Sequence, residues 1–216
     1  MRISRRALAQ AAIVSITLTG LVACRPGEVP APVAGVMGAP VDAEPTTGPT
    51  SDSIVSTALV ALDALRAGDP GAYARALGPV AAETAARAGI DPVDLLRVWT
   101  ATDGTRMTAV LSALSQVGVG YRHASSVPGK AFDCSGLVGW AWEQAGVALP
   151  HQSRGMINAV AHKDLAAVLP GDVFYYPGHV SMALGVGDAI VHAVGRGERV
   201  QVRPHSARGI TVGTPV

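Results

Sequence analysis

The chain has 216 residues, of which 49% are hydrophobic, and a formal net charge of +1 at pH 7. This length and apolar content are sufficient for a globular domain with a buried core. A net charge so close to zero gives no electrostatic basis for binding nucleic acid, and we expect no such partner.

The first 23 residues have the pattern of an export signal, with a basic start followed by an apolar run. The run ends in Leu21-Val22-Ala23-Cys24, which resembles the bacterial lipoprotein box. That resemblance implies cleavage before Cys24, diacylation of its thiol and anchoring on the outer face of a membrane. We therefore expect residues 1–23 to be a lipoprotein-type signal peptide and Cys24 to be the lipidation site.

Two alternatives stay open for this segment. The pair Arg5-Arg6 is compatible with twin-arginine export as well as with the general secretory route. An uncleaved transmembrane anchor is the alternative to cleavage, although the run is short and polar for a span of about 20 residues.

Residues 24–50 are rich in Pro and Gly and have almost no periodic apolar pattern. This composition is typical of a tether without a packed core. In a polyproline II conformation, such a tether would hold the folded part up to roughly 80 Å from the membrane.

Three amphipathic helices are expected within residues 51–103. Ser51 or Asp52 can cap the first helix, and Pro70 and Pro92 stand near the start of the next two. Because about 50 residues is near the lower limit for an independent core, we expect these helices to pack on the domain that follows. They carry no recognisable chemistry, which favours a structural or regulatory role over that of a binding module.

We expect a further domain over residues 104–216, and within it a helix that begins at Cys134. Asp133 stands at the cap position, and Gly146 ends the apolar run. Helix dipoles at this position favour the thiolate form of Cys134, although a buried, inert cysteine is the alternative. The only other cysteine, Cys24, belongs to the lipoprotein box. An unpaired thiol in an oxidising compartment favours a catalytic use.

Two segments of β-type composition carry His179 and His192 and are separated by a loop of hairpin length. If Leu184 pairs with Ala189, His192 lies opposite Ser181 and diagonal to His179 on the same face. A nucleophilic thiol needs a base, and that base needs a group that fixes its tautomer. The thiol and the two histidines supply one residue for each role.

Six short motifs follow one another across the second half of the chain. They are Gly120-Tyr121, Phe132-Asp133-Cys134-Ser135-Gly136-Leu137-Val138, Leu149-Pro150, Pro170-Gly171-Asp172-Val173, Gly178-His179-Val180 and Val191-His192-Ala193. This ordered set resembles the NlpC-type cysteine peptidases, a papain-like family that cuts peptides of the bacterial cell wall. The resemblance implies an α+β fold in which an antiparallel sheet packs against the helix that carries the cysteine, here preceded by a short helical region.

By this resemblance Cys134 is the nucleophile, His179 the base and His192 the residue that orients the base. The residues implied to contact substrate are Tyr121, Asp133 and Ser135. In some family members the last two positions hold the amine of the substrate peptide. The chain departs from the family where His151 follows Leu149-Pro150 in place of the usual arginine, and where Arg122-His123-Ala124 follows the tyrosine. These departures concern substrate preference more than catalysis.

We expect a cysteine endopeptidase that cleaves peptidoglycan stem peptides, at the bond from D-glutamate to the diamino acid, through an acyl-enzyme. The protein would be exported and lipid-anchored, facing the cell wall. The alternatives are an amidase or acyltransferase on the same scaffold and a non-catalytic wall-binding lipoprotein. No cofactor is implied.

A zinc site on His179 and His192 would lack a third ligand, so we expect no metal. The remaining histidines considered, His123, His162 and His205, are expected to be solvated. The sequence indicates no oligomeric state.

Overall fold

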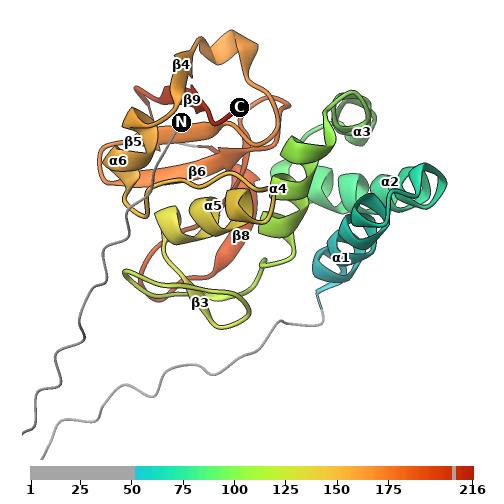
Figure 1. Ribbon diagram of the computed structural model, residues 1–216, viewed down its shortest axis with the longest axis horizontal. Helices are drawn as coiled ribbons and strands as arrows, with labels where there is room; N and C mark the ends of the chain where they lie inside the picture. Colours follow the sequence, from blue (N-terminus) through green and yellow to red (C-terminus); the bar gives the residue numbers. More distant parts are fainter. Residues whose placement is uncertain (1–51, 206–207) are drawn as a thin grey trace, which may run out of the picture. The chain divides into compact units, whose positions relative to one another are not determined.

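The computed structural model describes residues 52–205 and 208–216, and the predicted signal segment and tether lie outside them. Four helices open the described chain (Figure 1): α1 (Ser53–Arg66), α2 (Pro70–Ala88), α3 (Pro92–Thr100) and α4 (Gly104–Leu114). An aspartate precedes each of them and accepts a hydrogen bond from a backbone N–H of the first turn. Such capping satisfies N–H groups that have no partner within the helix. Of the two residues predicted as possible caps of α1, Asp52 is the one that caps it.

These helices share one apolar core with the rest of the described chain. In this arrangement α1 packs on α2 and α4, and α4 packs on α5 (Cys134–Glu143), as Figure 1 shows. Trp99 of α3 is fully buried, and its Nε1–H donates to the carbonyl of Leu184 at 2.9 Å. The helices of residues 51–103 therefore pack on the following domain as expected, while the division at residue 104 stays a prediction. Within the described residues, no helix is both long enough and apolar enough to cross a membrane.

A six-stranded sheet forms the other layer, with strand order β4-β9-β5-β6-β7-β8. Its strands are β4 (Ala161–Lys163), β5 (Val173–Tyr176), β6 (His179–Ala183), β7 (Ala189–Ala193), β8 (Val200–Pro204) and β9 (Thr211–Thr214). All neighbouring strands run antiparallel. Helix α5 covers one face, where Leu137 joins Val180 and Val191 in the main core. The predicted α+β fold, with an antiparallel sheet against the helix of Cys134, is confirmed.

The predicted register between the two histidine strands is also confirmed. The N–H of Leu184 donates to the carbonyl of Ala189 at 2.9 Å, and Met182 pairs with Val191. Because side chains alternate between the two faces of a strand, this register places His179 and His192 on the same face.

A second, three-stranded sheet lies before α5. In it β2 (Ser126–Val127) pairs with β3 (Ala131–Phe132), and β3 also pairs with β1 (Gly120–Tyr121). After α5, the short helix α6 (Ser153–Asn158) ends before Ala161, which begins β4 and pairs with β9. A short 3-10 helix, Leu165–Ala167, follows.

A buried ionic cluster joins α4 to the sheet. Arg106 is only 5% exposed, and its Nη1 donates to Asp172 Oδ1 at 2.9 Å and to the carbonyl of Pro170 at 3.0 Å. Lys163 Nζ lies 3.0 Å from the other carboxylate oxygen of Asp172, which is fully buried. Charges this deep are tolerated because they are paired and hydrogen-bonded.

Replacing Arg106 with Met should therefore lower the free energy of unfolding by about 3 kcal/mol, because Asp172 would keep a buried charge with only Lys163 to offset it. Urea denaturation measures this change. The matched control is Arg97→Met, which breaks the exposed ion pair with Asp94 and should stay within about 0.5 kcal/mol of the unchanged protein. Equal effects of the two substitutions would show that the buried cluster does not stabilise the fold.

Candidate active site

Cys134 lies at the first position of α5 and is 8% exposed. The preceding residue, Asp133, caps the helix as predicted, since its Oδ1 accepts the N–H of Gly136 at 2.6 Å. A side chain at position 136 would not fit, because its Cβ would lie 2.1 Å from the carbonyl oxygen of Ser125. The glycine of the Asp-Cys-Ser-Gly motif thus allows the loop before the helix to approach the cap closely.

The expectation that the helix start favours the thiolate is wrong for the free protein. Burial raises the pKa of the Cys134 thiol above its ordinary value, and the negative charge of Asp133 raises it further. The backbone N–H groups of Val180, Ser135 and Cys134 itself act in the opposite direction, but burial is the largest effect. Loss of hydration disfavours the charged form more than these dipoles favour it. The resting group is therefore a thiol.

Strand β6 brings a histidine next to this thiol. The backbone N–H of Val180 points to the sulfur, and His179 is the adjoining residue. The paired part of β6 and β7 consists of Met182–Val191 and Ala183–Ile190, so Val180 lies beyond it. His179 Nε2 lies 3.0 Å from His192 Nδ1, and His192 is 1% exposed. The structure thus brings the two predicted histidines into contact and places β6, the strand of His179, against Cys134.

Both histidines are neutral at physiological pH. Burial, followed by the positive charges of Arg203 and His205, lowers the pKa of His179 to about 4. Burial likewise lowers the pKa of His192 to about 3, followed by the charges of Arg203, His179 and His205. A neutral imidazole is the form that can accept a proton from a thiol.

Two tyrosines lie close enough to the thiol for its charge to affect them. Burial and then the charges of Cys134 and Asp133 raise the pKa of Tyr121, which the sequence had placed in the site. Burial also raises the pKa of Tyr176, whose ring stacks on His179 with centroids 5.0 Å apart. Sequence reasoning missed Tyr176 as a site residue. A two-residue Pro-Gly turn separates Tyr176 from His179 and makes them cross-strand neighbours. This turn could have indicated that Tyr176 lies in the site.

A second unpredicted contact joins His151 to Asp133. Three groups meet at Asp133 Oδ1: the N–H of Gly136, the hydroxyl of Ser135 at 3.1 Å and Nε2 of His151 at 3.1 Å. The histidine that replaces the family's usual arginine therefore contacts one of the predicted substrate residues.

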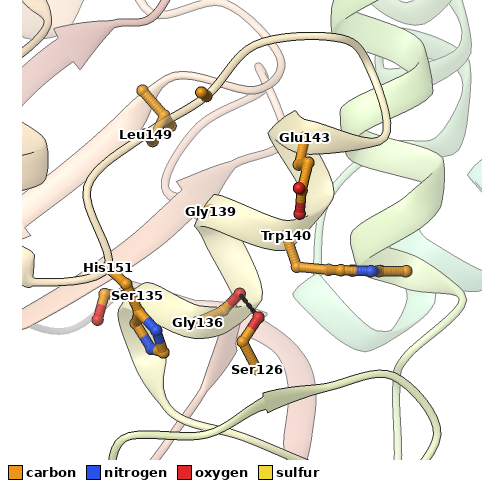
Figure 2. Close-up of a pocket in the computed structure, with 9 residues that line it drawn as sticks. Ser126, Ser135, Gly136, Gly139, Trp140, Glu143, Leu149 and His151 are labelled. Carbon is orange, nitrogen blue, oxygen red and sulfur yellow. Dashed lines mark hydrogen bonds between the residues drawn. The ribbon is translucent and has the colours of Figure 1, made fainter. Parts of the chain in front are cut away.

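Beyond this contact a pocket of about 210 Å³ follows the outer face of α5 (Figure 2). Ser135 and His151 lie at one end, Glu143 lies at the other, and Trp140 forms one wall. Gly136 and Gly139 contribute no side chain, which leaves the helix surface open between the two ends.

One expectation about the remaining histidines is wrong. His205 is not solvated but buried, and its ring contacts Phe174 and Tyr176 edge-on. Its backbone N–H donates to the carbonyl of Asp188 at 2.7 Å, which continues the pairing of β7 with β8 by one residue. His123 and His162 are exposed as expected. Among the described residues, no group of three or more His, Cys, Asp or Glu side chains could hold a metal ion.

The lowered histidine pKa values predict that stability falls as the pH decreases from 7 to 5. The unfolded chain, with histidine pKa values near 6.5, takes up protons in this interval that the folded protein does not bind. Each of the two histidines then contributes about 1.4 kcal/mol per pH unit at the lower end. Melting temperatures across this interval test the effect, and His192→Gln should make the decrease smaller. A constant melting temperature would show that both imidazoles accept protons in the folded state.

Comparison with known proteins identifies the region that holds this site. Residues 118–212 match the NlpC/P60 family. A probable endopeptidase of Mycobacterium tuberculosis is 41% identical over 108 residues, which are 49% of this chain and 28% of that protein. Peptidoglycan endopeptidase RipB of the same species is 40% identical over 84 residues, 37% of this chain and 34% of RipB.

A third relative is the bifunctional muramidase/DL-endopeptidase CwlT of Bacillus subtilis. It is 33% identical over 88 residues, which are 39% of this chain and 24% of CwlT. The chain thus spans about a third or less of the length of each of these three relatives. The match runs from β1 into β9 and includes Tyr121, Cys134, His179 and His192. Residues 118–212 of this chain are thus similar to the NlpC/P60 family.

Proposed function

We propose that this protein is a cysteine endopeptidase that hydrolyses peptidoglycan stem peptides outside the cytoplasm. The observation that carries the proposal is the contact of His179 with His192, together with the position of His179 on the strand whose Val180 N–H meets the Cys134 thiol. Two relatives named peptidoglycan endopeptidase and DL-endopeptidase support the substrate class and the kind of bond. The bond we propose is the one between D-glutamate and the diamino acid.

Catalysis begins with the thiol protonated and the base neutral. When a substrate carbonyl reaches Cys134, Nδ1 of His179 accepts the thiol proton while the sulfur attacks the carbonyl carbon. The tetrahedral intermediate then collapses, and the imidazolium of His179 gives the proton to the leaving amine. A water molecule, deprotonated by the same histidine, hydrolyses the resulting thioester and frees the carboxylic acid and the thiol.

The helix start supports this reaction after the proton has moved. Backbone N–H groups of Cys134 and Ser135 face the sulfur and lower its pKa. Such N–H groups also stabilise an oxyanion that forms on the adjacent carbonyl oxygen. His192 contacts Nε2 of His179, which leaves Nδ1 as the nitrogen of the proposed base that can accept the thiol proton.

The substrate groups nearest the cysteine would meet Tyr121, Asp133 and Ser135. Asp133 is 6% exposed, and its Oδ1 is already surrounded by donors. In this proposal the substrate amine meets the carboxylate of Asp133, with the hydroxyl of Ser135 beside it. Tyr121 lies in β1, close enough to Cys134 and Asp133 for their charges to raise its pKa, and we propose that it contacts the substrate next to the reacting carbonyl.

The first test compares Cys134→Ser, His179→Ala and His192→Gln with defined muropeptides as substrates and product masses as the readout. Cys134→Ser and His179→Ala should lower turnover by at least about 1,000-fold, because each removes a reacting group. His192→Gln should retain more activity, since an amide can still orient the base. His162→Ala, an exposed histidine outside the site, is the control. Substantial turnover by Cys134→Ser would exclude the thiol mechanism, and the product masses identify the bond.

The second test concerns the anchor. We propose that Cys24 carries the lipid and that residues 25–50 tether the folded part to the membrane. Cys24→Ala in the full-length chain should block processing or release the protein from the membrane fraction, measured by fractionation and electrophoretic mobility. An unchanged distribution with unchanged mobility would contradict lipidation at Cys24.

A further inference from the structure

A row of side chains crosses the sheet on the face that carries the two histidines. Phe174 of β5 pairs with Ser181 of β6, and His192 of β7 pairs with Gln201 of β8. Continuing the register of β6 and β7 by one residue places Ser181 opposite His192. Directly opposed residues on antiparallel strands have Cβ atoms about 5 Å apart, which is within reach of a polar contact.

Two atoms in this row are buried polar groups that lack a partner. Ser181 is fully buried and His192 is 1% exposed. Ser181 Oγ and His192 Nε2 are both without a hydrogen bond to any described residue. An unsatisfied buried donor or acceptor is costly, and one ordered water can relieve two or three of them at once. The neighbour of His192 on the other side, Gln201, directs its amide to Glu198.

The tautomer of His192 decides whether His179 can act as a base. Since Nε2 of His179 contacts His192, only Nδ1 of His179 is left to accept the thiol proton. Its Nε2 must then carry the hydrogen and donate it to Nδ1 of His192. His192 must in turn hold its own hydrogen on Nε2, the buried atom without a partner. This tautomer therefore requires an acceptor at Nε2 of His192.

Arg203 favours the opposite tautomer. Its charge acts on both histidines, and its Nε is buried and makes no hydrogen bond to a described residue. A guanidinium can only donate, so it could satisfy Nε2 of His192 only when that nitrogen is an acceptor. His192 would then carry its hydrogen on Nδ1, and His179 would present an N–H to the thiol instead of a lone pair.

We infer that Ser181 is a positioning residue joined to His192 through one buried water, which accepts the Nε2–H of His192 and donates to the hydroxyl oxygen of Ser181. Ser181 thereby selects the tautomer of His192 that leaves Nδ1 of His179 free to accept a proton. Phe174 on its other side offers no competing polar group. The inference rests on the proposed role of His179 as the base, and it adds a fourth residue to the proposed catalytic group.

The test replaces Ser181 with Ala and reads the tautomer and the kinetics separately. In the free protein, ¹⁵N chemical shifts of the imidazole nitrogens should move from the Nε2–H form of His192 toward the Nδ1–H form. With muropeptide substrate, kcat should fall about tenfold with KM unchanged, the equivalent of one hydrogen bond of ordinary strength. Ser181→Thr, which keeps a hydroxyl, should recover most of the activity and the original tautomer.

The matched control is Ser112→Ala, which removes a buried hydroxyl of α4 that likewise has no hydrogen bond to a described residue. It should leave both the histidine shifts and kcat unchanged, so that a general effect of losing a buried hydroxyl is separated from a specific one. If Ser181→Ala keeps the Nε2–H tautomer, or keeps wild-type kcat, the inference is wrong. If the unchanged protein cleaves no muropeptide, the proposed function fails, while the shifts still show whether Ser181 sets the tautomer.

Discussion

The site depends on how β6 pairs with β7. Their register brings His179 and His192 to the same face, and a slip of one residue would move one ring to the opposite side of the sheet. The turn between the strands is fixed by packing as well as by hydrogen bonds. Gly185 has a φ of 88°, and a Cβ there would lie 2.6 Å from the ring of Pro170. Any side chain at this position would displace the turn and with it the register.

Burial determines the protonation states of the candidate catalytic groups. It raises the pKa of the Cys134 thiol and lowers those of His179 and His192, so all three are neutral in the free protein. The free protein therefore does not hold a preformed pair of thiolate and imidazolium. In the proposed mechanism these charges develop only when substrate is present. The backbone N–H groups around the sulfur then stabilise a charge that burial alone would oppose.

The helical region before the residues that match the NlpC/P60 family contributes to the same arrangement. Trp99 of α3 donates to the carbonyl of Leu184, directly before the turn between the histidine strands. Ile90 lies 3.8 Å from the position that a Cβ on Gly187 would occupy, within that turn. These contacts favour a structural role for the helical region, because they hold the turn between β6 and β7 in place. The Cys134 thiol meets the other end of β6, at Val180. A chain beginning at residue 104 would lose both contacts.

The sequence by itself determined the features that depend on neighbouring residues: the cap of α5 by Asp133, the start of that helix at Cys134, and the pairing of Leu184 with Ala189. These follow from helix capping and strand alternation, which are local rules. Only the tertiary structure decided the pKa direction of the thiol, the contact of His151 with Asp133 and the burial of His205. Each of these depends on which distant segments cover a side chain, because desolvation and hydrogen bonding are set by that packing and not by local sequence.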